Sequence, residues 1–124
     1  MILRHVALTC SSEINSDRIF KDLFGLQKSE PKILPLSLCE AIFDVDSELV
    51  MINYQGEDIH FEIFVTGDSK SSVKQIAHVC LEVEDLETFL KKCRDLDVNV
   101  SRIPKGDRTL TFIRDYDGNL FEIK

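Results

Sequence analysis

The chain carries one sequence pattern twice. His-Val-Ala-Leu at 5–8 returns as His-Val-Cys-Leu at 78–81, and Phe-Glu-Ile at 61–63 returns at 121–123. Each half therefore begins with a histidine in an apolar, strand-like segment and ends with a glutamate in another. Two copies are too few for a solenoid, which needs about three repeats to be stable. The duplication instead predicts two equivalent modules that pair.

The first half has the pattern of a strand, a helix and three strands. The expected strands are 1–10, 26–34, 48–54 and 58–65, the last two forming a hairpin. Turn and cap residues at 11–17 precede apolar residues at helical spacing, and Gly25 ends the helix. This copy is roughly a dozen residues longer than the second, and the extra residues are best placed around 31–46, between its second and third strands.

The second half repeats this order of elements. A helix over 85–96 has Asp85 as its N-cap and an apolar stripe along one face. The expected strands are 75–83, 98–103, 108–114 and 119–124. The sequence therefore predicts an α+β protein of two tandem βαβββ modules. Module one is 1–66, a linker rich in Gly, Asp, Ser and Lys is 67–74, and module two is 75–124. A length of 124 residues suits one globular domain.

Composition and charge exclude several classes of function. The formal net charge of −7 comes with no basic stripe, which argues against binding to nucleic acid. No apolar run approaches the length of about 18 residues that a membrane span needs, and the N-terminus has no signal-peptide pattern. The four cysteines lack Cys-x-x-Cys spacing, so reduced thiols and a cytoplasmic location are expected. Cys80 lies on the same strand face as His78, where it would be able to approach a site, but it is expected to be a small buried residue.

The repeated histidines and glutamates are candidate metal ligands. Alternation along a strand places His78 on the face of Cys80, and His5 on the face of Ala7, which is the more polar face in both copies. Imidazole nitrogen and carboxylate oxygen together bind divalent ions such as Zn²⁺, Ni²⁺, Co²⁺ or Mn²⁺ and leave positions open for substrate. The predicted ligands are His5, Glu62, His78 and Glu122. The third histidine, His60, has no counterpart and is interpreted as an exposed hairpin residue, or as a partner that supports Glu62.

The segments that carry these residues resemble the vicinal oxygen chelate superfamily, which includes glyoxalase I, bleomycin-binding proteins and ring-cleaving dioxygenases. The resemblance covers almost the whole chain, from Arg4-His-Val-Ala-Leu to Asp115-Tyr-Asp-Gly-Asn-Leu-Phe-Glu-Ile. It implies a cupped, eight-stranded mixed sheet around one metal ion. The ion would be nickel or zinc, with cobalt, manganese or iron as alternatives. The order His, Glu, His, Glu is similar to that of glyoxalase I.

The resemblance implies a lyase or isomerase that acts on a small oxygenated carbonyl compound. Metal assistance would lower the cost of removing a C–H proton, Glu122 would accept this proton, and Glu62 would be able to share the role. Members of this length commonly form homodimers. The expected partners are therefore a small-molecule substrate and a second copy of the chain. Whether the four ligands meet within one chain or across the dimer stays open, as does the identity of the substrate.

Two other functions fit the same resemblance. A metal-free binding protein of the bleomycin-resistance kind would use the acidic surface for a cationic drug, but that class generally lacks the metal ligands. A non-haem iron dioxygenase would use two histidines and one glutamate, and Glu62 would then fill a position that such enzymes leave open for oxygen. The identity of the bound metal would distinguish the three functions. Nickel or zinc favours the isomerase, ferrous iron favours the dioxygenase, and absence of metal favours the binding protein.

Overall fold

A computed structural model describes residues 3–67 and 77–124 of the chain. The chain divides into two compact units, residues 1–69 and 70–124, each of which is considered by itself. The predicted linker at 67–74 lies outside the described residues except for Gly67.

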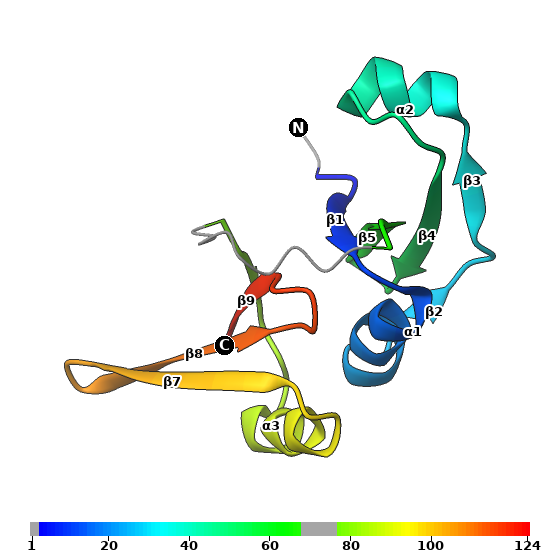
Figure 1. Cartoon of the computed structure of the whole chain (residues 1–124). Coiled ribbons are helices and arrows are strands. Elements are labelled where there is room, and N and C mark those ends of the chain that lie inside the picture. Colours follow the sequence, from blue (N-terminus) through cyan, green and yellow to red (C-terminus); the bar gives the residue numbers. More distant parts are fainter. Residues whose placement is uncertain (1–2, 68–76) are drawn as a thin grey trace. The chain divides into compact units, whose positions relative to one another are not determined.

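The first unit is built on a five-stranded mixed sheet (Figure 1). Its strands are β1 Val6–Cys10, β2 Gln27–Lys28, β3 Lys32–Leu34, β4 Leu49–Gln55 and β5 His60–Val65. β1 runs parallel to β5, β4 runs antiparallel to β5, and β2 and β3 pair with successive parts of β4. The predicted second strand at 26–34 is thus split in two, and the predicted first strand begins only at Val6.

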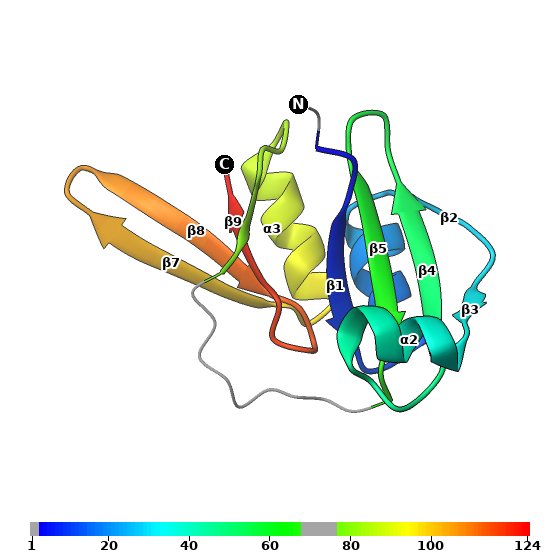
Figure 2. The same cartoon turned by 90° about the horizontal axis from the view of Figure 1, so that it is seen from above.

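A helix covers the apolar face of this sheet (Figure 2). It starts as α1, Glu13–Ser16, where the Ser12 side chain accepts a hydrogen bond from the Asn15 N–H, and it continues in wider turns as η1, Asp17–Leu23. The Phe20 ring packs on Tyr54 and Phe61 of the sheet, and all three rings are fully buried. Residues 15–17, predicted as turn and cap residues, are helical, because the cap lies earlier, at Ser12. Gly25 ends the helix as predicted, at φ 72°.

The extra residues of the first half form a second helix that sequence reasoning did not predict. α2, Leu36–Phe43, lies between β3 and β4 on the face opposite α1 and ends at Asp44 in the left-handed region. Helices this short are marginal on their own. A ring contact from Phe43 to Phe64 of β5, with centroids 5.2 Å apart, anchors its end to the sheet. The insertion therefore lies within 31–46, as predicted from the sequence, and packing against the sheet stabilises it as a helix.

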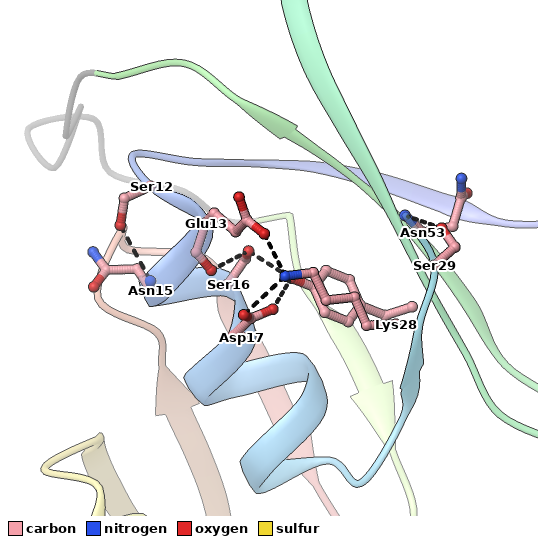
Figure 3. A network of polar contacts seen from close by, with 9 residues as sticks. Ser12, Glu13, Asn15, Ser16, Asp17, Lys28, Ser29 and Asn53 are labelled. Carbon is pink, nitrogen blue, oxygen red and sulfur yellow. Dashed lines mark hydrogen bonds and ion pairs between the residues drawn. The ribbon is translucent and has the colours of Figure 1, made fainter. Parts of the chain in front are cut away.

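A polar network links the first helix to the sheet (Figure 3). The Lys28 Nζ contacts Glu13 Oε1 at 2.5 Å and Asp17 Oδ2 at 2.9 Å. The buried Tyr54 hydroxyl donates to Asp17 Oδ1 at 2.7 Å and lies 2.7 Å from Ser16 Oγ. Burial alone would raise the pKa of Asp17, but the hydrogen bonds from Tyr54 and Lys28 and the Lys28 charge outweigh it, so this pKa is lowered.

We expect Tyr54→Phe to destabilise the protein by about 1–3 kcal/mol at neutral pH, because it removes a buried hydrogen bond to a carboxylate. The ionised Asp17 carboxylate stabilises the folded state fully when the pH is above the ordinary pKa of an aspartate. This stabilisation is lost as the pH falls through the lowered pKa of Asp17 in the folded protein. The difference from wild type should therefore narrow near pH 3. Urea unfolding at the two pH values measures it. Tyr116→Phe is the matched control, since the Tyr116 hydroxyl donates to the carbonyl of Leu96, which does not titrate. Equal losses for Tyr54→Phe at both pH values would contradict this account.

The second unit repeats the plan with a four-stranded sheet in the order β6-β9-β8-β7. Its elements are β6 Val79–Leu81, α3 Leu86–Asp95, β7 Asn99–Lys105, β8 Arg108–Arg114 and β9 Leu120–Ile123. Asp85 caps α3 by accepting from the Thr88 N–H at 3.1 Å, as predicted. Pro104, predicted as a turn residue, lies inside β7, which tolerates proline because β7 is an edge strand. The predicted α+β fold of two modules is confirmed. Module two is βαβββ, and module one departs from this plan by its split second strand and by α2.

Candidate metal centre

Each module places its histidine and glutamate in the same relative position. In both modules the first and last strands pair in parallel. The glutamate of the last strand lies opposite a residue of the first strand that follows the histidine by two positions. Glu62 is in register with Ala7, and Glu122 is in register with Cys80. His5 and His78 each precede their strand by one residue instead of lying inside it. The repeated motif thus produces a repeated arrangement of side chains.

Both histidine–glutamate pairs are close enough to act together. His5 Nε2 lies 3.3 Å from Glu62 Oε2, and His78 Nε2 lies 3.8 Å from Glu122 Oε2. The glutamates are the less exposed partners, with side chains 21% and 16% accessible. Two ligand atoms at about 2.1 Å from one tetrahedral or octahedral ion would lie about 3.0–3.4 Å apart. The first pair, at 3.3 Å, has this separation, whereas the second, at 3.8 Å, is wider and would have to close by a few tenths of an ångström to hold an ion. The meeting of the two pairs at one ion stays a prediction.

The surroundings of the two pairs differ in polarity. In module one the His5 ring meets the His60 ring edge-on, with centroids 5.8 Å apart, and His60 Nε2 lies 2.7 Å from Asn53 Oδ1. In module two the His78 ring meets Phe112 edge-on at 5.7 Å. His60 is half-buried and hydrogen-bonded, so the interpretation of an exposed hairpin residue is wrong. Asn53 was not singled out from the sequence, because its contact with His60 depends on the pairing of β4 with β5.

Glu122 has further polar neighbours in module two. Its Oε1 lies 3.6 Å from Lys124 Nζ. Desolvation, and then the negative charge of Glu122, raise the pKa of the Cys80 thiol. Cys80 is exposed, which corrects the expectation of a buried residue. Among the described residues, the short strand β6 pairs with β9 at the edge of its sheet.

A pocket of about 520 Å³ opens next to His5 in the first unit. It lies where the segment before β1 meets the turn between β4 and β5, and its polar lining includes Arg4, His5, Gln55 and His60. A volume in this range suits a small molecule. One member of the candidate metal centre therefore borders a space that a ligand can enter.

The family model of the Glyoxalase/Bleomycin resistance protein/Dioxygenase superfamily matches residues 4–123. The chain belongs to this superfamily, as the resemblance of its motifs indicated. No curated protein matches the chain significantly. Within the described residues, no helix has the length and apolar character needed to cross a membrane.

Solved structures share the fold at low sequence identity. A glyoxalase family protein from Enterococcus faecalis has a TM-score of 0.73 at 16% identity, covering 98% of this chain and 94% of that one. The fosfomycin resistance protein FosX from Mesorhizobium loti has a TM-score of 0.70 at 15% identity, with 98% and 88% covered. FosX from Listeria monocytogenes, solved with Mn(II) and sulfate, has a TM-score of 0.70 at 16% identity, with 98% and 88% covered. At this identity the likeness concerns the fold alone.

Proposed function

We propose that this protein is a divalent-metal-dependent lyase or isomerase that acts on a small oxygenated carbonyl compound. His5, Glu62, His78 and Glu122 would hold the ion, with nickel or zinc expected and manganese, cobalt or iron as alternatives. The observation that carries the proposal is the equivalent placement of the two histidine–glutamate pairs, at 3.3 Å and 3.8 Å. The Mn(II) bound to FosX, a protein of the same fold, supports metal binding in general.

The chemistry follows from the proposed ligands and their surroundings. A bound divalent ion supplies Lewis acidity, which lowers the cost of removing a proton next to a carbonyl. The Glu122 carboxylate is proposed to accept this proton. The wider separation from its histidine supports this role, because Glu122 is less closely held than Glu62. Lys124, 3.6 Å from Glu122, supplies a positive charge beside the carboxylate. Glu62, in the closer pair, is proposed mainly as a ligand.

The four proposed ligands support the two alternative functions, a metal-free binding protein and an iron dioxygenase, less well. A metal-free binding protein has no need of two matched histidine–glutamate pairs. A ring-cleaving iron dioxygenase needs an open position for oxygen, which a fourth ligand at Glu62 would fill.

We propose a homodimer as the working form, with a small molecule as the other partner and the cytoplasm as its location. The ligands of one ion would come either from both modules of one chain or from modules of two chains. Both arrangements use the same four residues.

The test starts with elemental analysis of the purified protein. We expect about one Ni, Zn, Mn, Co or Fe ion per set of four ligands. The second step is incubation in D₂O with a panel of hemithioacetals and 2-substituted acyl thioesters. Fosfomycin is included because the FosX proteins are fosfomycin resistance proteins. Nuclear magnetic resonance should show exchange of a C–H proton for deuterium in at least one carbonyl compound.

The outcomes separate the candidate functions. Metal together with C–H exchange supports the lyase or isomerase. Ferrous iron with oxygen uptake and no exchange would favour the dioxygenase. Protein that binds no divalent metal and exchanges no proton would overturn the proposal in favour of a binding protein.

A further inference from the structure

The two glutamates of the candidate metal centre differ in their polar partners. The Glu122 carboxylate has three partners: His78 Nε2 lies 3.8 Å from Oε2, Lys124 Nζ lies 3.6 Å from Oε1, and the Cys80 thiol is hydrogen-bonded to it. Within the described residues, the Glu62 side chain has one polar partner, the histidine of its own module, at 3.3 Å. The duplication therefore repeats the histidine but not the two other partners.

Apolar residues stand in module one where these two partners stand in module two. Ala7 takes the place of Cys80, because each lies opposite the glutamate in the register of the first and last strands. Phe64 takes the place of Lys124, because each follows the glutamate by two positions. Neither alanine nor phenylalanine has a side-chain donor. Module one forms the same parallel pair of strands with these residues, so the pairing requires a donor at neither position.

Strand geometry gathers the three partners around the Glu122 carboxylate. His78 and Cys80 are two residues apart, so they lie on one face of the first strand of the module. The Lys124 N–H donates to the Leu81 carbonyl at 2.9 Å, which extends the pairing of β9 with β6 by one residue. The Lys124 side chain thereby projects on the Glu122 face. One carboxylate oxygen lies toward the histidine and the other toward the lysine.

The thiol and the ammonium limit how firmly a metal ion can hold Glu122. A carboxylate accepts hydrogen bonds and does not donate, so both groups donate to it and compete with an ion for its lone pairs. Glu62 has no such donors and can give both oxygens to an ion. A glutamate that is shared among several partners keeps an oxygen available for a substrate proton, which a base requires.

The contacts of Cys80 and Lys124 add little to folding. The Lys124 side chain is 64% accessible, and an exposed ion pair of this kind contributes little to stability. A thiol is a weak donor. Glu82, the next residue on the Cys80 face, places a second negative charge near the thiol, but the Lys124 ammonium forms its ion pair with Glu122. Both donors therefore act mainly on the position of one carboxylate.

We propose that Cys80 and Lys124 are positioning residues, which hold the Glu122 carboxylate partly away from the metal ion and thereby determine which of the two equivalent glutamates accepts the substrate proton. This inference rests on the proposed function, because it explains the division of roles between Glu122 and Glu62. Neither positioning residue touches the reacting atoms. Without them, Glu122 should resemble Glu62, as a firmer ligand and a poorer base.

The test compares metal affinity with the rate of C–H exchange in a double variant. Cys80→Ala and Lys124→Met together remove both donors, and the alanine copies module one. Affinity for Ni²⁺ and Zn²⁺ is measured by titration against a chelator. Exchange in D₂O is measured at saturating metal with the hemithioacetal or acyl thioester that wild type exchanges fastest. Cys80→Ser and Lys124→Arg each keep a donor, and Glu82→Gln is a control that removes a charge from the same face.

We expect the two measurements on the double variant to change in different directions. Exchange should fall about five- to twentyfold through loss of two weak donors, whereas metal affinity should stay the same or rise. A merely structural role would lower both. Cys80→Ser and Lys124→Arg should keep most of the exchange rate. Glu82→Gln should exchange within about twofold of wild type, as expected for an exposed charge.

The two glutamate variants, made in the double variant, test the division of roles. In the otherwise unchanged protein, Glu122→Gln should slow exchange more than Glu62→Gln does. In the double variant, the two changes should slow exchange by similar factors, because both glutamates then have a histidine as their main partner. A difference between them as large as in the otherwise unchanged protein would contradict the inference.

Further outcomes separate this inference from the function on which it rests. Suppose that wild type exchanges protons and Glu122→Gln does not. A double variant that exchanges at the wild-type rate, or that loses metal affinity, would then overturn this inference alone. Wild-type protein that binds no divalent metal and exchanges no proton would overturn the proposed function, and the inference with it.

Discussion

Glu122→Gln should lower turnover by about 10²-fold or more while the metal stays bound. Glutamine keeps the shape of the side chain and an oxygen that ligates weakly, but it has no carboxylate to accept a proton. The expected deficit is in the rate of C–H exchange at saturating substrate. Exchange in D₂O measures this rate, and elemental analysis of the same sample reports the metal.

Glu62→Gln is the matched control for this prediction. It makes the same chemical change at the equivalent position of module one, where the carboxylate lies closer to its histidine, at 3.3 Å against 3.8 Å. We expect Glu62→Gln to weaken metal binding more and to slow exchange less at full metal loading. A larger loss of exchange in Glu62→Gln, with the metal retained, would transfer the role of base to Glu62. Full activity in both variants would remove the carboxylates from the mechanism.

His5→Ala and His78→Ala should each weaken metal binding by about 100-fold or more. Substitution of a residue that only supports a metal ligand lowers metal affinity by about 10- to 100-fold. Loss of a ligand itself should lower the affinity at least as much as the upper end of this range. Titration against a chelator of known affinity measures the change. Circular dichroism of each variant establishes that the fold is kept, as expected for side chains 43% and 37% accessible.

The third histidine provides the control for these two variants. His60→Leu removes an imidazole that touches the His5 ring but is not a proposed ligand. Its metal affinity should remain near that of wild type. Metal affinity that is unchanged in His5→Ala and His78→Ala would contradict the four-ligand centre. A loss as large in His60→Leu would instead include His60 among the ligands.

The sequence predicted the two modules and the pairing of histidine with glutamate in each of them. Alternation along strands has a period of two, so the repeated motifs place His5 with Ala7, and His78 with Cys80, on one face of each sheet. Parallel pairing of the first and last strands then brings Glu62 and Glu122 beside these residues. The repeat and the alternation can be recognised from a single chain, because they depend on neighbours in sequence. The parallel pairing itself joins residues far apart in sequence and was expected only from the duplication and the family resemblance.

Tertiary structure alone decided the contacts between residues far apart in sequence. Asn53 meets His60 because the turn after Gln55 determines the register of β4 against β5, and a shift by one residue would move the amide to the other face. The helix α2 depends on the contact of Phe43 with Phe64, since eight residues without strong amphipathic spacing form no stable helix alone. Cys80 is exposed because its register with Glu122 places it on the face opposite the buried Phe121 and Ile123, whereas composition alone favours burial of a cysteine. The Asn53–His60 contact, the helix α2 and the exposure of Cys80 depend on strand register and packing. Neither can be predicted from the local sequence around these residues.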